Sequence, residues 1–390
     1  MSFVYLLIEF LDELIYGISE AAWPLIRDDL HLNYIQIGIA LSLPGFLANF
    51  IEPFLFTLGD TWKRRAVILA GGIFFTVSLA LTGISYSFLF LLSSFILFHP
   101  SSGAFVSLSQ ASLMDLQPER REQNMACWTF AGSLGVFIGP ILLSGAAFIG
   151  FGWRGMFLSL ALLSTFILIY AWNKIPNDKP HPVSFPRFTD ILNQFKLTFK
   201  ALRNWTIVRW LILLEFSNLM LDVLYGFLPL YFVDVAGFTP AQAALSVAVW
   251  TGVGLLGDFL LIPLVERIKG LDYLRISVII ELILFPLFLL SSQAWLKLVI
   301  IAFMGFFNSG WYAILKANLF DAMHGQSGAV LTLDNVSGLF GKLIPFGIGV
   351  AAHNFGIGTA MWFLLAGPIA LFIGLPKKSQ RSQVESHLDL

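Results

Sequence analysis

The sequence is poor in the residues that disulfides, metal sites and soluble surfaces require. Only 12% of its 390 residues are charged, about half the share of an ordinary soluble domain. The one cysteine, Cys127, cannot form a disulfide within the chain. A net charge of −1 argues against a nucleic-acid partner. Metal-ligand spacings, phosphate-binding glycine loops and nucleophile elbows are absent from the sequence, so we expect no enzyme, cofactor or metal site.

Apolar residues dominate the chain instead. Hydrophobic side chains make up 57% of it, and the mean hydropathy is +0.80. Because about 20 apolar residues span a bilayer, the long apolar runs predict an all-α polytopic membrane protein with twelve transmembrane helices. We place these helices at residues 3–26, 34–58, 66–84, 87–114, 124–149, 153–173, 206–233, 239–264, 273–292, 294–320, 328–351 and 357–375.

One long polar segment, residues 174–205, divides the predicted helices into two sets of six. The sequence therefore predicts an N-terminal bundle (1–173), this connector, a C-terminal bundle (206–375) and a tail (376–390). If both ends and the connector are cytoplasmic, 18 of the 23 lysines and arginines lie on that side. The positive-inside rule then puts both termini in the cytoplasm of a cell whose plasma or inner membrane holds the chain. We expect a monomer in the bilayer.

An offset of 206 residues aligns the charged positions of the two halves without a gap. Self-similarity at a fixed period is typical of repeat architectures. Two such halves in an apolar protein predict a transporter with its site between parallel repeats. The matched acids are Glu9 and Glu215, Asp28 and Asp234, Glu52 and Asp258, Asp60 and Glu266, and Asp115 and Asp321; Gln36 also meets Gln242, Gly132 meets Gly338 and Gly135 meets Gly341.

Several acids lie inside the first and seventh predicted helices. Spacings of three, four, seven and eleven residues place those of the first helix on one face, and the seventh helix repeats the pattern. Each charge near mid-bilayer costs about 2.5–3.5 kcal/mol, so these faces must line a wet cavity, pair with cations or be partly protonated. The first helix carries Glu9, Asp12, Glu13 and Glu20 with Tyr16 between them, and the seventh carries Glu215, Asn218, Asp222 and Tyr225.

Clustered carboxylates at low dielectric disfavour each other's ionisation, which suits groups that load and release protons. Two simpler interpretations stay open: Glu9 is an interfacial carboxylate, and Asp222 forms a structural ion pair with Lys316 or Lys342. The candidates for proton coupling are Glu9 and Asp12 first, followed by Glu13, Glu215 and Asp222.

Further polar and aromatic side chains are candidates for the walls of the cavity. Lys316 and Lys342 are the deep bases of the second half. One interpretation is a lysine–aspartate pair, such as Lys342 with Asp334; the other is that Lys316 attracts an anionic substrate or is displaced when a carboxylate takes up its proton. His99 precedes Pro100, so a titratable ring adjoins a kink site, although a packing role for the ring stays open. The full set of cavity candidates is Tyr16, His99, Trp128, Asn218, Tyr225, Trp311, Lys316 and Lys342.

Acids also recur in the loops that follow the second and eighth helices. Asp60 and Glu266 hold equivalent positions there, and the N-terminus of a neighbouring helix favours such a charge by roughly 0.3–1 kcal/mol. We interpret them as parts of a conformational gate. Glu52 and Asp258 precede them by about two turns and are expected to bind the loop bases from within. The gating candidates are Asp60, Arg64, Arg65, Glu266, Glu52 and Asp258.

The first of these loops resembles a family signature. The run from Gly59 to Arg65, with an acid followed by clustered bases, resembles the loop 2–3 motif of the major facilitator superfamily. Phe56, Thr61 and Lys63 depart from that motif, which puts its tight turn and one salt bridge in doubt. The resemblance covers the whole chain and implies a twelve-helix fold with the first and seventh helices beside a central cavity.

Other motifs extend this resemblance. Gly135-x-x-x-Gly139-Pro140 is similar to the antiporter signature of the same superfamily, which occurs mainly in exporters, and Trp153-Arg154 at the start of the sixth helix is also typical. The first half is similar to fosmidomycin-resistance-type efflux proteins at Trp23-Pro24-Leu25, Gln36-Ile37-Gly38 and Phe98-His99-Pro100.

The expected function is secondary active transport of a small organic solute by alternating access. Proton-coupled efflux of drug-like or metabolite molecules is the leading hypothesis. The main alternative is proton-coupled uptake of a sugar, a carboxylate or another nutrient. A receptor or scaffold built on a transporter fold is a third possibility, but such a protein has no need of titratable groups that face each other across the repeat axis. The partners implied are the solute, protons and the lipid bilayer.

Overall fold

The computed structural model describes residues 2–61, 63–116, 121–176, 202–322, 333 and 337–376, and all regular structure among them is helical. The first half comprises α1 (Ser2–Ala21), α2 (Trp23–Leu30), α3 (Tyr34–Thr61), α4 (Arg64–Gly83), α5 (Phe88–Ser102), η1 (Gly103–Ser107), α6 (Leu108–Leu116), α7 (Arg121–Phe148) and α8 (Gly152–Lys174). The second half comprises α10 (Trp205–Asn218), η3 (Leu219–Val223), α11 (Leu224–Asp234), α12 (Pro240–Arg267), α13 (Gly270–Leu290), α14 (Ala294–Asn308), α15 (Trp311–Asp321), α17 (Ile344–Phe355), α18 (Ile357–Ala360), η4 (Met361–Leu365) and α19 (Ala366–Gly374).

These helices confirm the predicted all-α polytopic fold. Ten of the described helical segments are long and apolar enough to cross a membrane. The first predicted span is helical too, as α1 and α2, but four acids lower its hydropathy. The eleventh predicted span, 328–351, lies partly outside the described residues and ends in α17. Most of the polar connector, residues 177–201, also lies outside them.

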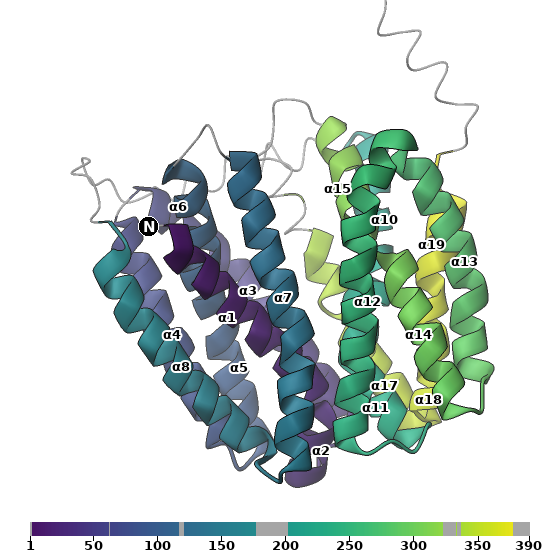
Figure 1. The fold of residues 1–390 in the computed structure, drawn as a ribbon, viewed down its shortest axis with the longest axis horizontal. Helices are drawn as coiled ribbons and strands as arrows, with labels where there is room; N and C mark the ends of the chain where they lie inside the picture. The colour runs from purple at the N-terminus through teal and green to yellow at the C-terminus, as the bar shows by residue number, and fades with distance from the viewer. Residues whose placement is uncertain are drawn as a thin grey trace, which may run out of the picture.

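The helices form two bundles that lie side by side (Figure 1). Helix α7 packs against α12, and α3 packs against α17. Smaller contacts of α11 with α1 and α2, and of α12 with α1, also join the halves. We call the end at which α1 begins and α8 ends the near end. The end at which α2 ends and α3 begins is the far end.

The same capping arrangement starts α3 in the first half and α12 in the second half. The backbone N–H of Asn33 donates to the Gln36 side chain and the Gln36 N–H donates back to the Asn33 side chain, both at 2.9 Å. Thr239 and Gln242 form the equivalent capping box at the start of α12. A capping box satisfies two backbone donors that a helix N-terminus otherwise leaves free. The predicted match of Gln36 with Gln242 therefore has a structural basis.

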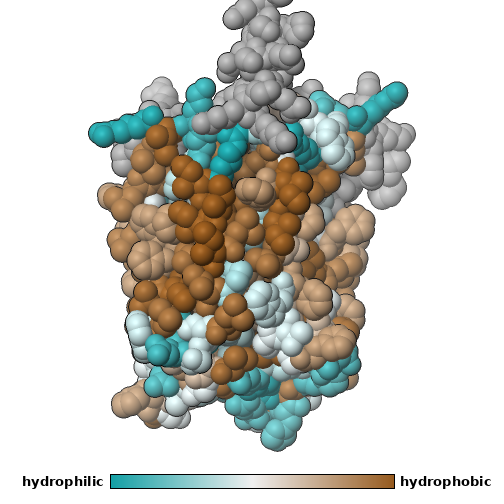
Figure 2. Space-filling model, turned by 90° about the vertical axis from the view of Figure 1, so that its right-hand side faces the viewer, coloured by the Kyte–Doolittle hydropathy of each residue, from teal (hydrophilic) through white to brown (hydrophobic). Residues whose placement is uncertain are grey.

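An apolar belt surrounds the molecule. Figure 2 shows hydrophobic side chains over the middle of the second half, with hydrophilic residues gathered towards both ends. Helices of the second half carry large exposed apolar residues, among them Ile283 on α13, Phe303 on α14 and Phe372 on α19, which are 57%, 53% and 57% exposed. A belt of this kind matches the hydrocarbon layer of a bilayer.

Three irregular turns interrupt the helices that border the middle of the molecule. Gly103–Ser107 and Leu219–Val223 are π-helical, a local geometry that is frequent at functional sites. A left-handed residue, Gly310 (φ +73°), separates α14 from α15, and its backbone N–H donates to Asp258 Oδ1 at 3.0 Å. The second of the π-helical turns carries Asp222 into the central site.

Candidate functional site

Two adjoining cavities lie between the halves. One, of about 160 Å³, is bordered by α1, α2, α3, α5, α10, η3, α11 and the start of α17. The other, of about 500 Å³, lies towards the near end. Both are lined by His99, Glu215, Asn218, Asp222, Gly338 and Lys342. The site therefore narrows from the near end towards the far end.

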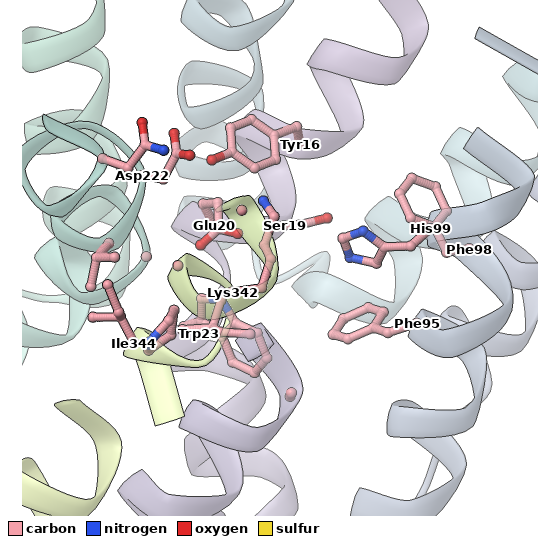
Figure 3. A pocket seen from close by; sticks show the side chains of 18 of the residues that line it. Tyr16, Ser19, Glu20, Trp23, Phe95, Phe98, His99, Asp222, Lys342 and Ile344 are labelled. Carbon is pink, nitrogen blue, oxygen red and sulfur yellow. The ribbon is translucent and has the colours of Figure 1, made fainter. Parts of the chain in front are cut away.

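Helix α1 presents Tyr16, Ser19 and Glu20 to the smaller cavity. Their spacing of three and four residues places them on one helical face, as the sequence predicts for Tyr16. Figure 3 shows Tyr16, Glu20, Asp222 and Lys342 on one side of the cavity and residues of α5, including His99, across from them. Carboxylates from both halves thus meet at one site.

Glu215 rests on glycines in the second half. A Cβ atom added to Gly341 would lie 1.9 Å from Glu215 Oε2, so the carboxylate occupies the space that any larger residue would fill. The Ser337 hydroxyl donates to Glu215 Oε1 at 3.3 Å. Glu215 lines both cavities, which agrees with the predicted position of this acid.

Three acids of α1, namely Glu9, Asp12 and Glu13, do not line the cavities. Glu9 is 8% exposed, and a Cβ atom on Gly132 of α7 would lie 2.7 Å from its Oε1. Asp12 accepts a hydrogen bond of 2.9 Å from the Ser102 hydroxyl of α5. Neither of them, nor Glu13, lines the two cavities. In this conformation the predicted first candidates for proton coupling face α5 and α7 inside the first bundle.

Two basic side chains line the site. Lys342 borders both cavities, and its methylene chain packs beside Gly45, whose added Cβ would lie 3.2 Å from Lys342 Cδ. Among the described residues Lys342 forms no ion pair, so this conformation does not contain the structural pair with Asp222 that was the simpler alternative. His99 borders both cavities as well, as predicted. Asp334, the alternative partner of Lys342, lies outside the described residues.

A series of aromatic rings joins the halves at the level of the smaller cavity. The ring centroids of Tyr16 and Tyr225 are 5.3 Å apart, and those of Tyr225 and Trp250 are 5.4 Å apart. Tyr225 is 3% exposed, and within the described part of the chain its hydroxyl has no hydrogen-bond partner. These rings extend from α1 of one half to α12 of the other, and they are held by ring contacts.

Four predicted cavity residues do not line either cavity, and one of them is Tyr225 of the ring series. Trp311 is fully buried in the second bundle, where its Nε1 donates to the Ser277 hydroxyl at 2.8 Å. Trp128 is 4% exposed on α7. Lys316 lies over the ring of Tyr312, 5.4 Å from its centroid, and it is Tyr312 that borders the larger cavity. Aromatic residues of apolar helices serve packing more often than ligand contact, and sequence spacing alone does not separate the two roles.

Polar contacts between the halves close the far end. Arg27 of α2 forms an ion pair with Asp234 of α11, and the Tyr34 hydroxyl donates to the same carboxylate. Arg27 Nη1 also donates to the Tyr34 hydroxyl at 3.3 Å. Nearby, the Phe346 N–H of α17 donates to Ser42 Oγ of α3 at 2.8 Å. The far end is therefore shut in this conformation.

The predicted gating residues at the near end have mixed outcomes. Arg64 pairs with Asp115 at 2.6 Å, and Arg65 Nη2 donates to the Trp172 carbonyl oxygen at 2.6 Å, both within the first half. The side chains of Asp60 and Glu266 lie outside the described residues.

The prediction that Glu52 and Asp258 bind the loop bases is wrong for this conformation. Asp258 accepts the Gly310 N–H at the break between α14 and α15. Glu52 lines the larger cavity, and a Cβ atom on Gly103 would lie 2.8 Å from its Oε1. Both acids thus reach an interrupted helix of their own half rather than the loop that follows them.

Sequence reasoning missed two features of the site. The first feature is the position of Glu20 in the cavity, because Glu20 was counted among the acids of the first helix but not among the site residues. It lies about one turn after Tyr16, and this spacing indicates that the two side chains share the cavity. The second feature is the ion pair of Arg27 with Asp234. The repeat match of Asp28 with Asp234 draws attention to Asp234, but it does not identify the base of the other half that pairs with it.

Comparison with known proteins assigns the fold to a family. The family model described as the Major Facilitator Superfamily matches residues 5–344. The chain belongs to the major facilitator superfamily. It is 21% identical over 385 residues to the quinolone resistance protein NorA of Staphylococcus aureus (strain COL), covering 95% of this chain and 94% of that protein.

Solved structures of the superfamily share the fold. The nucleoside transporter NupG superposes with a TM-score of 0.75 at 12% identity, covering 96% of this chain and 98% of that one. A D-xylose–proton symporter superposes with a TM-score of 0.70 at 15% identity, covering 95% and 97%. This superfamily member is a multi-pass membrane transporter and not an enzyme.

Proposed function

We propose that this transporter moves a small organic solute by alternating access and couples the movement to protons, with export in exchange for protons as its direction. The observation that carries this proposal is that carboxylates from both halves line one cavity: Glu20 comes from the first half, and Glu215 and Asp222 come from the second. Groups that both halves reach can take up a proton in one conformation and release it in the other.

The cavity also suits alternating access. It is shut at the far end by Arg27, Tyr34 and Asp234 and widens towards the near end. We propose that the near end is cytoplasmic, because most lysines and arginines flank it, and that the chain acts as a monomer in the cell membrane. The described conformation is then inward-facing, and breaking the far-end contacts opens the site to the outside.

Export is favoured by the similarity to NorA, named for quinolone resistance, and by the glycines of α7. Gly135 and Gly139 approach the backbone of α1 closely: their added Cβ atoms would lie 2.6 Å from the Phe10 oxygen and 2.8 Å from the Leu14 oxygen. This contact is the structural counterpart of the antiporter signature. Uptake is the second candidate, because a proton symporter for D-xylose shares the fold.

One experiment separates these readings. The purified protein is placed in liposomes that contain a pH-sensitive dye, and gradients of drugs, nucleosides and sugars are imposed in turn. Exchange predicts that protons move against the direction of the solute, whereas uptake predicts that both move together. The variant Asp222→Asn serves as the control for coupling. Solute flux without any proton movement in the unmodified protein would refute proton coupling and leave facilitated transport.

A further inference from the structure

The side chains around the central cavities are unevenly charged. Among the residues that the structure describes, four carboxylates line them, those of Glu20, Glu52, Glu215 and Asp222, against one amine, that of Lys342. A cavity of one predominant charge in low-dielectric surroundings attracts ligands of the opposite sign. This imbalance bears on the charge of the substrate, which the sequence leaves undecided.

We propose that the substrate of this transporter is an organic cation, whose ammonium group sits between Glu20 and Asp222 and replaces Lys342 as the counter-charge of that cluster. The proposal rests on the transport function proposed above and names the chemical class of its solute. Glu20 is then a specificity-determining residue that reads the charge of the ligand.

Glu20 is held in place across the interface between the halves. A Cβ atom on Gly226 of α11 would lie 2.9 Å from Glu20 Oε2, so the absence of a side chain at Gly226 makes room for the carboxylate. Position 226 is the repeat equivalent of position 20, so one half supplies the acid and the other supplies the space. Glu20 Oε2 is buried and has no hydrogen-bond partner in the part of the chain that the structure describes.

Aromatic side chains line the cavity that this carboxylate borders. Trp23, which is 2% exposed, lines the same cavity, and its Nε1 also has no partner within the described ranges. Tyr16 and Phe95 complete the wall (Figure 3). Ring faces attract an ammonium group, and more strongly when water is excluded. The wall therefore fits a cation with an apolar or aromatic body.

Lys342 marks where such a cation binds. Its amine is tethered in the acidic site, yet it forms no ion pair with the described acids and belongs to the turn that precedes α17. A ligand ammonium that gains ring contacts as well as carboxylates can displace this loosely held charge. An anionic substrate would instead bind to Lys342 and would have to overcome four carboxylates.

The test measures binding to the purified full chain in nanodiscs by calorimetry. The probes are benzyltrimethylammonium, its uncharged isostere neopentylbenzene, and the anion benzenesulfonate. We expect the cation to bind in preference to both others. Glu20→Gln should weaken cation binding at least about tenfold, because one of two nearby charges is lost, and Lys342→Gln should strengthen it. Gly226→Ala, which displaces the Glu20 carboxylate and keeps its charge, should also weaken binding.

Size-exclusion profiles and circular dichroism of each variant establish that it is folded, and Gly226→Ala provides a second variant if Glu20→Gln does not fold. Equal binding of the cation and neopentylbenzene, preference for benzenesulfonate with its loss in Lys342→Gln, or no binding of any probe each overturns the proposal. Solute-linked proton flux in liposomes is measured separately, so a transporter of neutral or anionic solutes would keep the proposed function and lose only this inference.

Discussion

The matched glutamates of the two halves both lie beside glycines, but at repeat positions about one turn apart, and they differ in exposure. In the first half Glu9 lies over Gly132 and is 8% exposed. In the second half Glu215 lies over Gly341 and lines both cavities. The glutamate of the first half is therefore enclosed, whereas its copy in the second half borders the cavities.

The cause of this difference is the backbone packing beside each glutamate. A Cβ atom on Gly135 would lie 2.6 Å from the Phe10 oxygen, so α7 meets α1 backbone to backbone. At the equivalent Gly341 the nearest atoms belong to the Glu215 side chain, which keeps α10 apart from the segment before α17. The comparison teaches that the repeat fixes which residues carry charge, whereas helix separation decides which of them reach the cavity. We expect the conformation that is open at the far end to differ most at these two contacts.

The largest effect is expected from removing an acid that lines the site in the second half. Asp222→Asn should reduce proton-driven transport at least about tenfold, equivalent to about 1.4 kcal/mol, because Asp222 borders both cavities. Asp12→Asn should stay within about threefold of the unmodified protein, because Asp12 accepts the Ser102 hydrogen bond inside the first bundle. Uptake of labelled solute by liposomes under a pH gradient measures both, and counterflow exchange without a gradient is the control. Equal losses in the two variants would contradict the assignment of coupling to the acids that line the cavities.

Matched alanine substitutions of the glycines should separate stability from transport. Gly135→Ala puts a methyl group against rigid backbone of α1 and should lower the free energy of unfolding by about 1–3 kcal/mol. Gly341→Ala meets the flexible end of Glu215, which can move into the cavity, so stability should change by less than about 1 kcal/mol while transport falls. Thermal unfolding in detergent and liposome transport are the two measurements. Greater destabilisation by Gly341→Ala would contradict the described difference in packing.

The smallest effect is expected at the far-end ion pair, which is partly exposed. Arg27→Gln should shift the conformational equilibrium towards opening at the far end by up to about fivefold, or about 1 kcal/mol, because the Arg27–Asp234 pair joins the halves. Arg154→Gln is the matched control, because Arg154 pairs with Asp29 of its own half.

Distances between spin labels measure this shift. Ile149 and Leu290 are 76% and 71% exposed and are loop-proximal positions of opposite halves, so each can carry a label after replacement by cysteine. Cys127→Ser removes the one native cysteine. A longer distance population in Arg27→Gln and an unchanged one in Arg154→Gln are expected. No change in either variant would exclude this ion pair as part of the gate.

Much of the fold could be predicted from the sequence because apolar length and repeat spacing act locally. The twelve spans, the duplicated acids and the match of Gln36 with Gln242 all follow from periodicity. The candidate site could be predicted only in part. Glu215 and Asp222 line the cavity as expected, whereas Glu9 and Asp12 do not, because the close approach of α1 and α7 is a tertiary property. The contact of Glu20 with Gly226 is equally non-local.

The ring contacts of Tyr16, Tyr225 and Trp250 affect the activation barrier for tilting one half relative to the other. Contacts between ring faces vary gradually with angle, whereas a hydrogen bond weakens steeply when it is misaligned. The ring contacts in the middle of the molecule can therefore persist while the two bundles tilt relative to each other. We expect the activation barrier between conformers to arise mainly at the polar far-end contacts, with little friction at the centre.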